Sequence, residues 1–92
     1  SESSPAIKFK LLKNLMNMSS INSENGTATE DIVTEYSGDE IEIGFNSKYI
    51  LEMINNLEDE TITLKFKDSS SPVTAEETSN PQLIYVLMPM RV

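Results

Sequence analysis

The hydrophobic pattern changes period within one short stretch, residues 40–57, and this change limits the possible folds. Ile41, Ile43 and Phe45 alternate with polar or small residues, which is the period-two pattern of a half-buried strand. From residue 46 onward the apolar residues recur at helical spacing, at Tyr49, Ile50, Met53, Ile54 and Leu57. A strand that leads directly into a helix, among further short strands, indicates an α+β domain.

Asn46 lies at the junction between the two patterns. It is a residue type that caps helices, because its side chain accepts hydrogen bonds from the first free N–H groups. The acidic run Glu58-Asp59-Glu60 lies at the unfavourable end of the helix dipole. We therefore expect the helix to stop by about Leu57.

Shorter patterns on either side of this stretch predict the remaining elements. Alternation predicts strands at 7–11, 15–20, 27–36 and 61–67. Residues 83–88 are apolar on both faces, which predicts a last strand covered on both sides. Residues 73–77 predict a weak, polar strand at a sheet edge or in solvent. Turn-forming residues predict loops at 13–14, 22–26, 37–39, 68–72 and 78–81.

The order of these elements indicates two related units. Residues 40–88 read β-α-β-β-β, whereas residues 7–36 hold three trailing strands with no leading strand and helix before them. We therefore predict that the chain begins partway through the first unit, with Ser1–Pro5 frayed. An uncovered apolar sheet face favours association, so we expect the isolated chain to be marginally stable or to self-associate.

Composition excludes several classes of function. The chain has 92 residues, enough for one domain, and a net charge of −8, which argues against an autonomous nucleic-acid binder. It has no Cys and no His, which removes disulfides, thiolate nucleophiles, most zinc sites and imidazole acid–base chemistry. We expect no cofactor, no metal, no membrane span and a reducing, cytoplasmic setting.

Charged and hydroxyl clusters offer only weak candidates for chemistry. The pair Asp39-Glu40 and the run Glu58-Asp59-Glu60 have the composition of a cation site or an acid–base pair, but solvated turn charge is the favoured interpretation. The serines at 69–71 favour a turn over a nucleophile. The strand lysines serve either phosphate contact or solubility: Lys8, Lys10, Lys65 and Lys67. Lys48, on the polar face of the helix, is the better candidate for a phosphate contact, because a helix face is a rigid platform.

The last residues, 86–92, are apolar where chain ends are usually polar. Pro89 ends the last strand because it has no N–H to donate. Met88 and Met90 then admit two interpretations. They cap the core, or they form a shallow apolar pocket for a partner peptide, with Arg91 available to an acidic group.

Three sequence motifs resemble the bacterial DNA polymerase III β sliding clamps. They are Glu42-Ile43-Gly44-Phe45-Asn46 followed by Tyr49, the turn Asp68-Ser69-x-Ser71-Pro72, and the terminus Tyr85-Val86-Leu87-Met88-Pro89-Met90-Arg91-Val92. The resemblance spans nearly all 92 residues and places them in the C-terminal (third) domain. It implies the DNA-clamp (processivity) fold: antiparallel sheets with one helix here, built from β-α-β-β-β units.

The resemblance also implies a function in DNA replication. Members of this family are non-catalytic processivity factors that form a head-to-tail dimeric ring around duplex DNA. Their partners are the catalytic polymerase, the clamp loader and repair proteins, which dock short clamp-binding peptides in an apolar pocket beside the C-terminus. The expected partners of this chain are therefore duplex DNA, such peptides and, in the full-length protein, a second copy.

Site residues follow from the resemblance position by position. The implied peptide pocket comprises Asn46, Tyr49, Pro72, Val86, Met88, Pro89, Met90 and Arg91, with Leu87 and Val92 beside it. The implied dimer contact is an edge strand that includes Thr27, Thr29, Glu30, Asp31 and Ile32. Lys48 is the implied contribution to the DNA channel.

Two other functions compete with this interpretation. A stand-alone β-rich module would bind peptides without encircling DNA. A hydrolase is disfavoured because the chain has neither His nor Cys; turnover lost on mutation of Asp39 or Glu40 would revive it.

Overall fold

The computed structural model describes residues 6–22 and 26–91, and the side chains of residues 6–20 and 28–91. The elements are β1 (Ala6–Leu12), β2 (Leu15–Asn22), β3 (Gly26–Val33), β4 (Ile41–Asn46), α1 (Ser47–Asn55), β5 (Thr63–Lys65), β6 (Val73–Glu77) and β7 (Asn80–Leu87). The predicted frayed segment Ser1–Pro5, the centre of the predicted loop at 22–26 and the terminal Val92 lie outside the described residues.

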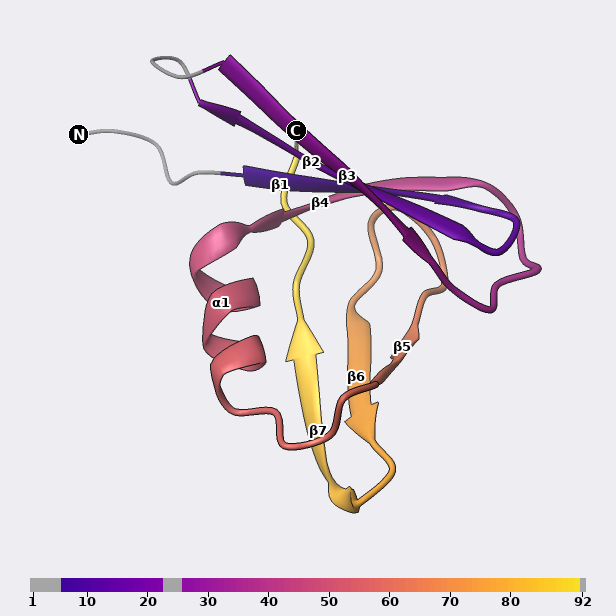
Figure 1. The fold of residues 1–92 in the computed structure, drawn as a ribbon, viewed down its shortest axis with the longest axis vertical. Coiled ribbons are helices and arrows are strands. Elements are labelled where there is room, and N and C mark those ends of the chain that lie inside the picture. The colour runs from indigo at the N-terminus through magenta and orange to yellow at the C-terminus, as the bar shows by residue number, and fades with distance from the viewer. Residues whose placement is uncertain (1–5, 23–25, 92) are drawn as a thin grey trace.

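The strands form two antiparallel sheets, with the order β3-β2-β1-β4 in one and β5-β6-β7 in the other. Figure 1 shows the two sheets crossing each other, with α1 beside β7 and the C-terminus returning to the first sheet. The predicted α+β architecture of antiparallel sheets and one helix is therefore confirmed for the described residues.

The core fills the space between the two sheets and the inner side of α1. Phe9 of β1 and Phe45 of β4 lie at its centre, with ring centroids 5.3 Å apart and planes at 63°, an edge-to-face arrangement. The other buried apolar residues are Leu11, Met16, Ile43, Ile50, Met53, Val73, Ala75 and Leu87. The inward row of β4 thus anchors the strand from which the helix starts.

The predicted junction between β4 and α1 is confirmed. Asn46 accepts a hydrogen bond through Oδ1 from the backbone N–H of Lys48, at 2.9 Å. The helix ends at Asn55, two residues before the predicted limit, and the Asn56 side chain donates to the Glu52 carbonyl at 2.7 Å. The buried face is narrower than the helical pattern predicts: Tyr49 is 55% exposed and Ile54 47% exposed.

The turn between β1 and β2 is the predicted two-residue turn, and Asn14 has a positive φ of 57°. β3 ends at Val33, short of the predicted Tyr36, because Val33 pairs with Leu15, the first residue of β2. Beyond this point the chain contacts the turn, and the Tyr36 backbone N–H donates to Asn14 Oδ1 at 3.1 Å.

Gly38 is required by the close packing of the turn that follows. The Tyr36 hydroxyl donates a hydrogen bond to the Asp39 carbonyl, so its ring lies across this turn. A Cβ atom at Gly38 would come within 2.8 Å of that hydroxyl oxygen. The predicted turn at 37–39 therefore tolerates only glycine without displacing Tyr36.

The strand predicted at 61–67 is wrong in length, because β5 spans only Thr63–Lys65. Only three residues of β6, 74–76, form backbone pairs with β5. The first residue of β6, Val73, pairs with Leu87 of β7 instead. The alternation itself is correct, because the apolar residues of this stretch all pack against the core: Ile62, Leu64 and Phe66.

The position predicted for residues 73–77 is also wrong. β6 is the central strand of its sheet, and Val73 and Ala75 are fully buried. Glu77 continues the inward row and is only 5% exposed. Three polar side chains in five residues suggested an edge or solvated strand, but two of them, Thr74 and Glu76, point to the other face. Backbone hydrogen bonds on both edges place β6 at the centre of its sheet.

The coverage predicted for the last strand is wrong as well. β7 is an edge strand, buried on its inner face at Leu87 and open on its outer face. Ile84, Val86 and Met88 are 50%, 60% and 65% exposed. An apolar pattern on both faces thus marks a strand with one buried face and one exposed apolar face.

Candidate functional site

A cavity of about 610 Å³ lies between α1 and the C-terminal strand. Helix α1 forms one wall, and β7 with the residues that follow it forms the other. The lining is predominantly apolar, and it consists of Asn46, Tyr49, Glu52, Met53, Asn56, Tyr85, Val86, Leu87, Met88 and Met90. Such a lining suits the apolar side chains of a ligand more than charged ones.

The helix wall is fixed by the strand that precedes it. Asn46 is both the last residue of β4 and the cap of α1, so the first turn of the helix continues directly from the core strand. Residues 49, 52, 53 and 56 recur every three to four positions, and they line the cavity along the helix. Met53, 4% exposed, anchors this wall in the core.

The strand wall combines an anchored residue with exposed ones. Leu87 is 5% exposed and packs in the core, whereas its neighbours Val86 and Met88 are 60% and 65% exposed. Methionine side chains are unbranched and polarisable, which lets them adapt to different apolar partners. In this wall Leu87 is therefore fixed by the core, whereas the exposed Met88 side chain can adapt to a ligand.

The tail after β7 crosses to the other sheet. The Met90 backbone N–H donates to the Gly44 carbonyl of β4 at 2.8 Å, forming an isolated bridge. Met90 is half-buried and Met88 is exposed. The contact of Met90 with β4 fits the capping interpretation, and Met88 is left on the surface, where the peptide-pocket interpretation stays a prediction.

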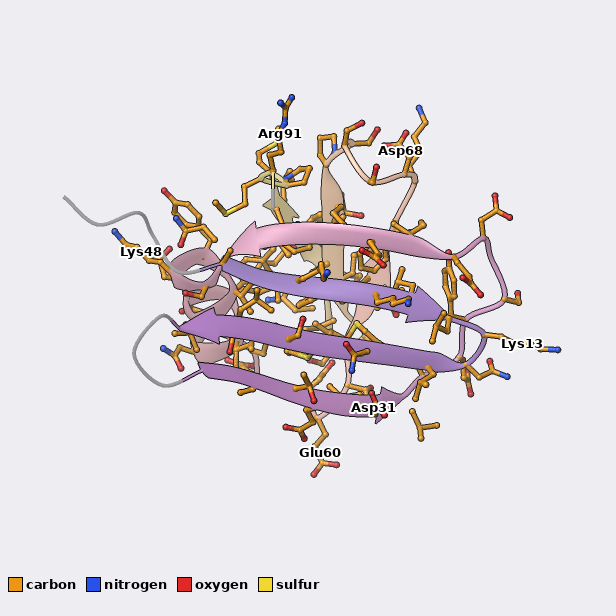
Figure 2. All side chains as sticks on the ribbon, turned by 90° about the horizontal axis from the view of Figure 1, so that it is seen from above. Lys13, Asp31, Lys48, Glu60, Asp68 and Arg91 are labelled. Atoms are coloured by element: carbon orange, nitrogen blue, oxygen red, sulfur yellow. The ribbon has the colours of Figure 1, made fainter. Side chains whose placement is uncertain are left out.

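The cavity contains part of the predicted pocket. Asn46, Tyr49, Val86, Met88 and Met90 line it, and so does Leu87. Pro72 lies next to the β5–β6 turn, and Pro89 links the two methionines. Figure 2 shows Arg91 beyond the β4 edge of the sheet, with its side chain pointing away from it. The structure thus brings five of the eight predicted residues together, and peptide binding stays a prediction for all eight.

Four lining residues were not predicted: Glu52, Met53, Asn56 and Tyr85. Helical spacing carries the signal that would have found three of them. Starting from Tyr49, steps of three and four residues reach Glu52, Met53 and Asn56. The tilt of α1 against β7, which brings Tyr85 to the cavity, has no counterpart in the local sequence.

The predicted turn at 68–72 is organised by Asp68. Its Oδ1 accepts hydrogen bonds from the backbone N–H groups of Ser70 and Ser71, at 2.9 and 2.7 Å. The backbone hydrogen bond from Ser70 and further bonds from Ser71 lower the pKa of the Asp68 carboxyl below its ordinary value. These serines have a structural role in the turn.

Three of the outward lysines are engaged in surface ion pairs. The ammonium groups of Lys8 and Lys10 lie 3.5 and 3.8 Å from the Glu42 carboxylate, and that of Lys65 lies 3.0 Å from Glu76. Exposed pairs of this kind contribute about 0–1 kcal/mol each. Lys48 is exposed on α1, as its polar-face position predicted.

The predicted dimer strand lies at an edge. β3 is the outermost strand of the first sheet, and Figure 2 shows Asp31 at this edge, opposite Arg91. Asp31 accepts a hydrogen bond from the Asn17 side chain at 2.8 Å, while Thr29, Glu30 and Ile32 are exposed. The side chain of Thr27 lies outside the described ones. The interface itself stays a prediction.

In the described part of the chain, no three or more acidic side chains are grouped so as to hold a metal ion. Within the same residues, no helix is long and apolar enough to cross a membrane.

Comparison with known proteins gives the class of this fold. The structure matches a beta sliding clamp from Caulobacter crescentus with a TM-score of 0.91 and 32% identity, over 100% of this chain and 24% of that one. It matches a sliding clamp from Bartonella birtlesii, bound to griselimycin, with a TM-score of 0.90 and 27% identity, over 100% and 25% of the two chains. The fold is that of a sliding-clamp domain.

Sequence comparison gives the family. Residues 1–91 match the family described as DNA polymerase III beta subunit, C-terminal domain. The beta sliding clamp of Salmonella typhimurium is 35% identical over 86 residues, which are 94% of this chain and 24% of that protein. The chain belongs to this family of C-terminal domains, and the resemblance in its motifs is confirmed. It spans about a quarter of the length of the relatives it matches.

Proposed function

We propose that this chain is part of the third domain of a replication processivity factor, and that its cavity docks partner peptides. The observation that carries the proposal is the apolar cavity beside the C-terminal tail, in a chain of the sliding-clamp family. The partners are the catalytic polymerase, the clamp loader and repair proteins. The role is that of a non-catalytic accessory protein in the cytoplasm.

The chemistry of the cavity supports peptide docking. Its two walls are an exposed helix face and an exposed strand face, with anchored side chains at the base and Met88 at the rim. An apolar side chain of a peptide would displace water from this surface and contact both walls. In solved relatives, the Caulobacter clamp binds polyethylene glycol at a candidate beta-motif tethering region, and the Bartonella clamp binds griselimycin.

The pairing of the strands supports a larger domain. β4, the leading strand of the complete β-α-β-β-β unit, pairs with β1 of the other unit. By the same rule, a leading strand of the first unit would pair with β5, which is the outermost strand of its sheet. The helix of that unit would then cover the inner face of β3, where Ile32 is 37% exposed.

Ring formation and DNA encirclement are the remaining parts of the proposal. The edge strand β3 would pair with the second copy through Thr27, Thr29, Glu30, Asp31 and Ile32. Helix α1 would face the channel, where Lys48 would contact phosphates without reading sequence. The net charge of −8 fits encirclement, because a closed ring does not depend on tight electrostatic binding.

Retention on circular DNA tests encirclement. The full-length protein, loaded on closed circular duplex DNA, should co-elute with the DNA and be released when the circle is cut with a restriction enzyme. Retention on the linear product would exclude topological linkage. Peptide binding without retention on the circle would favour a stand-alone peptide-binding module.

Two substitutions test the cavity. Met88→Ala combined with Met90→Ala should raise the dissociation constant of a labelled peptide from the clamp-binding segment of the cognate polymerase by about tenfold or more. Fluorescence anisotropy measures binding, and sedimentation checks that the ring still assembles. Val33→Ala, at a site 86% exposed, is the matched control. Unchanged binding in the double variant would remove the cavity from the proposal.

A further inference from the structure

Glu77 is a buried carboxylate at the end of β6. It is 5% exposed, and its alternation with Val73 and Ala75 directs it to the inner side of the sheet. Its Oε2 atom accepts hydrogen bonds from the backbone N–H groups of Glu58 and Asp59, at 2.7 and 2.6 Å. Burying a carboxylate is costly unless hydrogen bonds compensate it, and both of these bonds come from the loop after α1.

A second contact ties the same loop to the next turn. Asp59 Oδ2 accepts a hydrogen bond from the backbone N–H of Ser79, at 2.9 Å, in the turn between β6 and β7. The loop after α1 therefore donates hydrogen bonds to the β6–β7 hairpin and also accepts one from it. We call these four residues the loop brace: Glu58, Asp59, Glu77 and Ser79.

The loop brace acts on the end of α1 that no strand fixes. The first turn of the helix continues from β4, whereas its last turn leads into the loop that crosses the hairpin end of β6 and β7 (Figure 1). The Leu57 backbone N–H still donates to the Ile54 carbonyl, at 3.2 Å. The brace begins at the very next residue, so no free linker separates it from the helix end.

We propose that Glu77 is a positioning residue for the docking cavity. Glu77 holds the loop after α1 and thereby fixes the C-terminal end of α1 relative to the β6–β7 hairpin. Helix α1 and strand β7 are the two walls of the cavity. Glu77 does not itself line the cavity. The inference rests on the proposed function for its ligand, but the wall-to-wall separation can be measured without any ligand.

Substitutions at the brace test this role in the full-length protein. Glu77→Ala removes the acceptor, and Glu77→Gln keeps an oxygen that accepts both N–H groups. Asp59→Ala removes only the outer contact, which keeps the test decisive if Glu77→Ala does not fold. Glu76→Ala is the matched control, because this acid lies next in sequence, faces outward and pairs with Lys65.

Two measurements are made on each variant. Anisotropy with the labelled polymerase peptide gives the dissociation constant. Paired spin labels at Asn55→Cys on α1 and Ile84→Cys on β7, both outside the cavity, give the distribution of the wall-to-wall distance without peptide. Circular dichroism confirms that each variant is folded at the temperature used.

Glu77→Ala should broaden the distance distribution and raise the dissociation constant about tenfold, because two partly buried backbone N–H groups lose the acceptor that holds the loop. Glu77→Gln should bring both the distance distribution and the dissociation constant back to within about threefold of the wild-type values. Asp59→Ala should raise the dissociation constant by about twofold to threefold. Glu76→Ala should change neither quantity. An unchanged distance distribution in folded Glu77→Ala, or in Asp59→Ala if Glu77→Ala does not fold, would overturn the proposal. So would a broadened distribution with unchanged binding. If the wild-type protein does not bind the peptide, the proposed function fails, and the distance measurement still decides the role of Glu77.

Discussion

The strands β4 and β6 make the most informative comparison in this molecule. β4 has the strongest alternation in the chain, with Ile43 and Phe45 each 1% exposed, yet it is the outermost strand of its sheet. β6 has a weak, polar pattern, yet it is the central strand of the other sheet, and Val73 and Ala75 are fully buried. The strength of the pattern and the position in the sheet are therefore independent.

The reason is that the two properties have different physical origins. Alternation records which side chains face the core, and it depends on residues next to one another in sequence. Position in a sheet depends on which distant strands form hydrogen bonds with the backbone, and the side chains of one strand do not specify this.

Removing the aromatic ring of β4 should have the largest effect. Phe45→Ala deletes a fully buried ring that packs edge to face on Phe9, and it should reduce the free energy of unfolding by about 3–5 kcal/mol. Urea unfolding followed by circular dichroism measures the loss. Val33→Ala, on an 86% exposed side chain, should change it by less than about 0.5 kcal/mol. A similar cost for both would contradict the assigned core.

A change of one methyl to a hydroxyl tests the burial of β6. Val73→Thr nearly preserves shape but places a hydroxyl at a site that is 0% exposed, which should cost about 1–3 kcal/mol if the hydroxyl finds no partner. The same urea measurement applies, with Val33→Thr as the control. A solvated edge strand, as the sequence pattern suggested, would show no difference between the two variants.

The outer faces of the two strands should contribute similarly and little. On β4, Glu42→Gln removes the acidic partner of Lys8 and Lys10. On β6, Glu76→Gln removes the acidic partner of Lys65. Each should change the free energy of unfolding by about 0–1 kcal/mol, and less at high salt, because the pairs are exposed. A cost well above this range at either site would show that the outer face also decides strand position.

The smallest effect is confined to acid pH and concerns the turn that leads into β6. Because hydrogen bonds lower the pKa of Asp68 in the folded chain from its ordinary value of 3.8, its contribution to stability is present above that pH and lost as the pH falls through the lowered value. Asp68→Asn should therefore flatten the decline of the urea midpoint below about pH 4. An unchanged decline would show that other carboxyls carry it.

Much of the candidate site was predictable because its residues lie in two local segments. The apolar chain end pointed to Met88 and Met90, and the resemblance to sliding clamps assigned Asn46 and Tyr49 to the same site. Among the missed members, Glu52, Met53 and Asn56 share the helical spacing of Tyr49, whereas Tyr85 depends on how α1 lies against β7. Glu77 was predicted to lie in a polar strand at a sheet edge or in solvent, but it is buried and accepts hydrogen bonds from the loop after α1.

Local sequence was sufficient to predict the strand–cap–helix junction at Asn46, the turns at 13–14 and 68–72, and the alternating row Ile41, Ile43 and Phe45. These features depend on side chains that act on their own or neighbouring backbone, so the information is local. The tertiary structure alone decided that β6 is central, that β7 keeps an open apolar face, and that α1 and β7 face each other across a cavity. Those outcomes depend on hydrogen bonds and packing between residues far apart in sequence, which no single segment encodes.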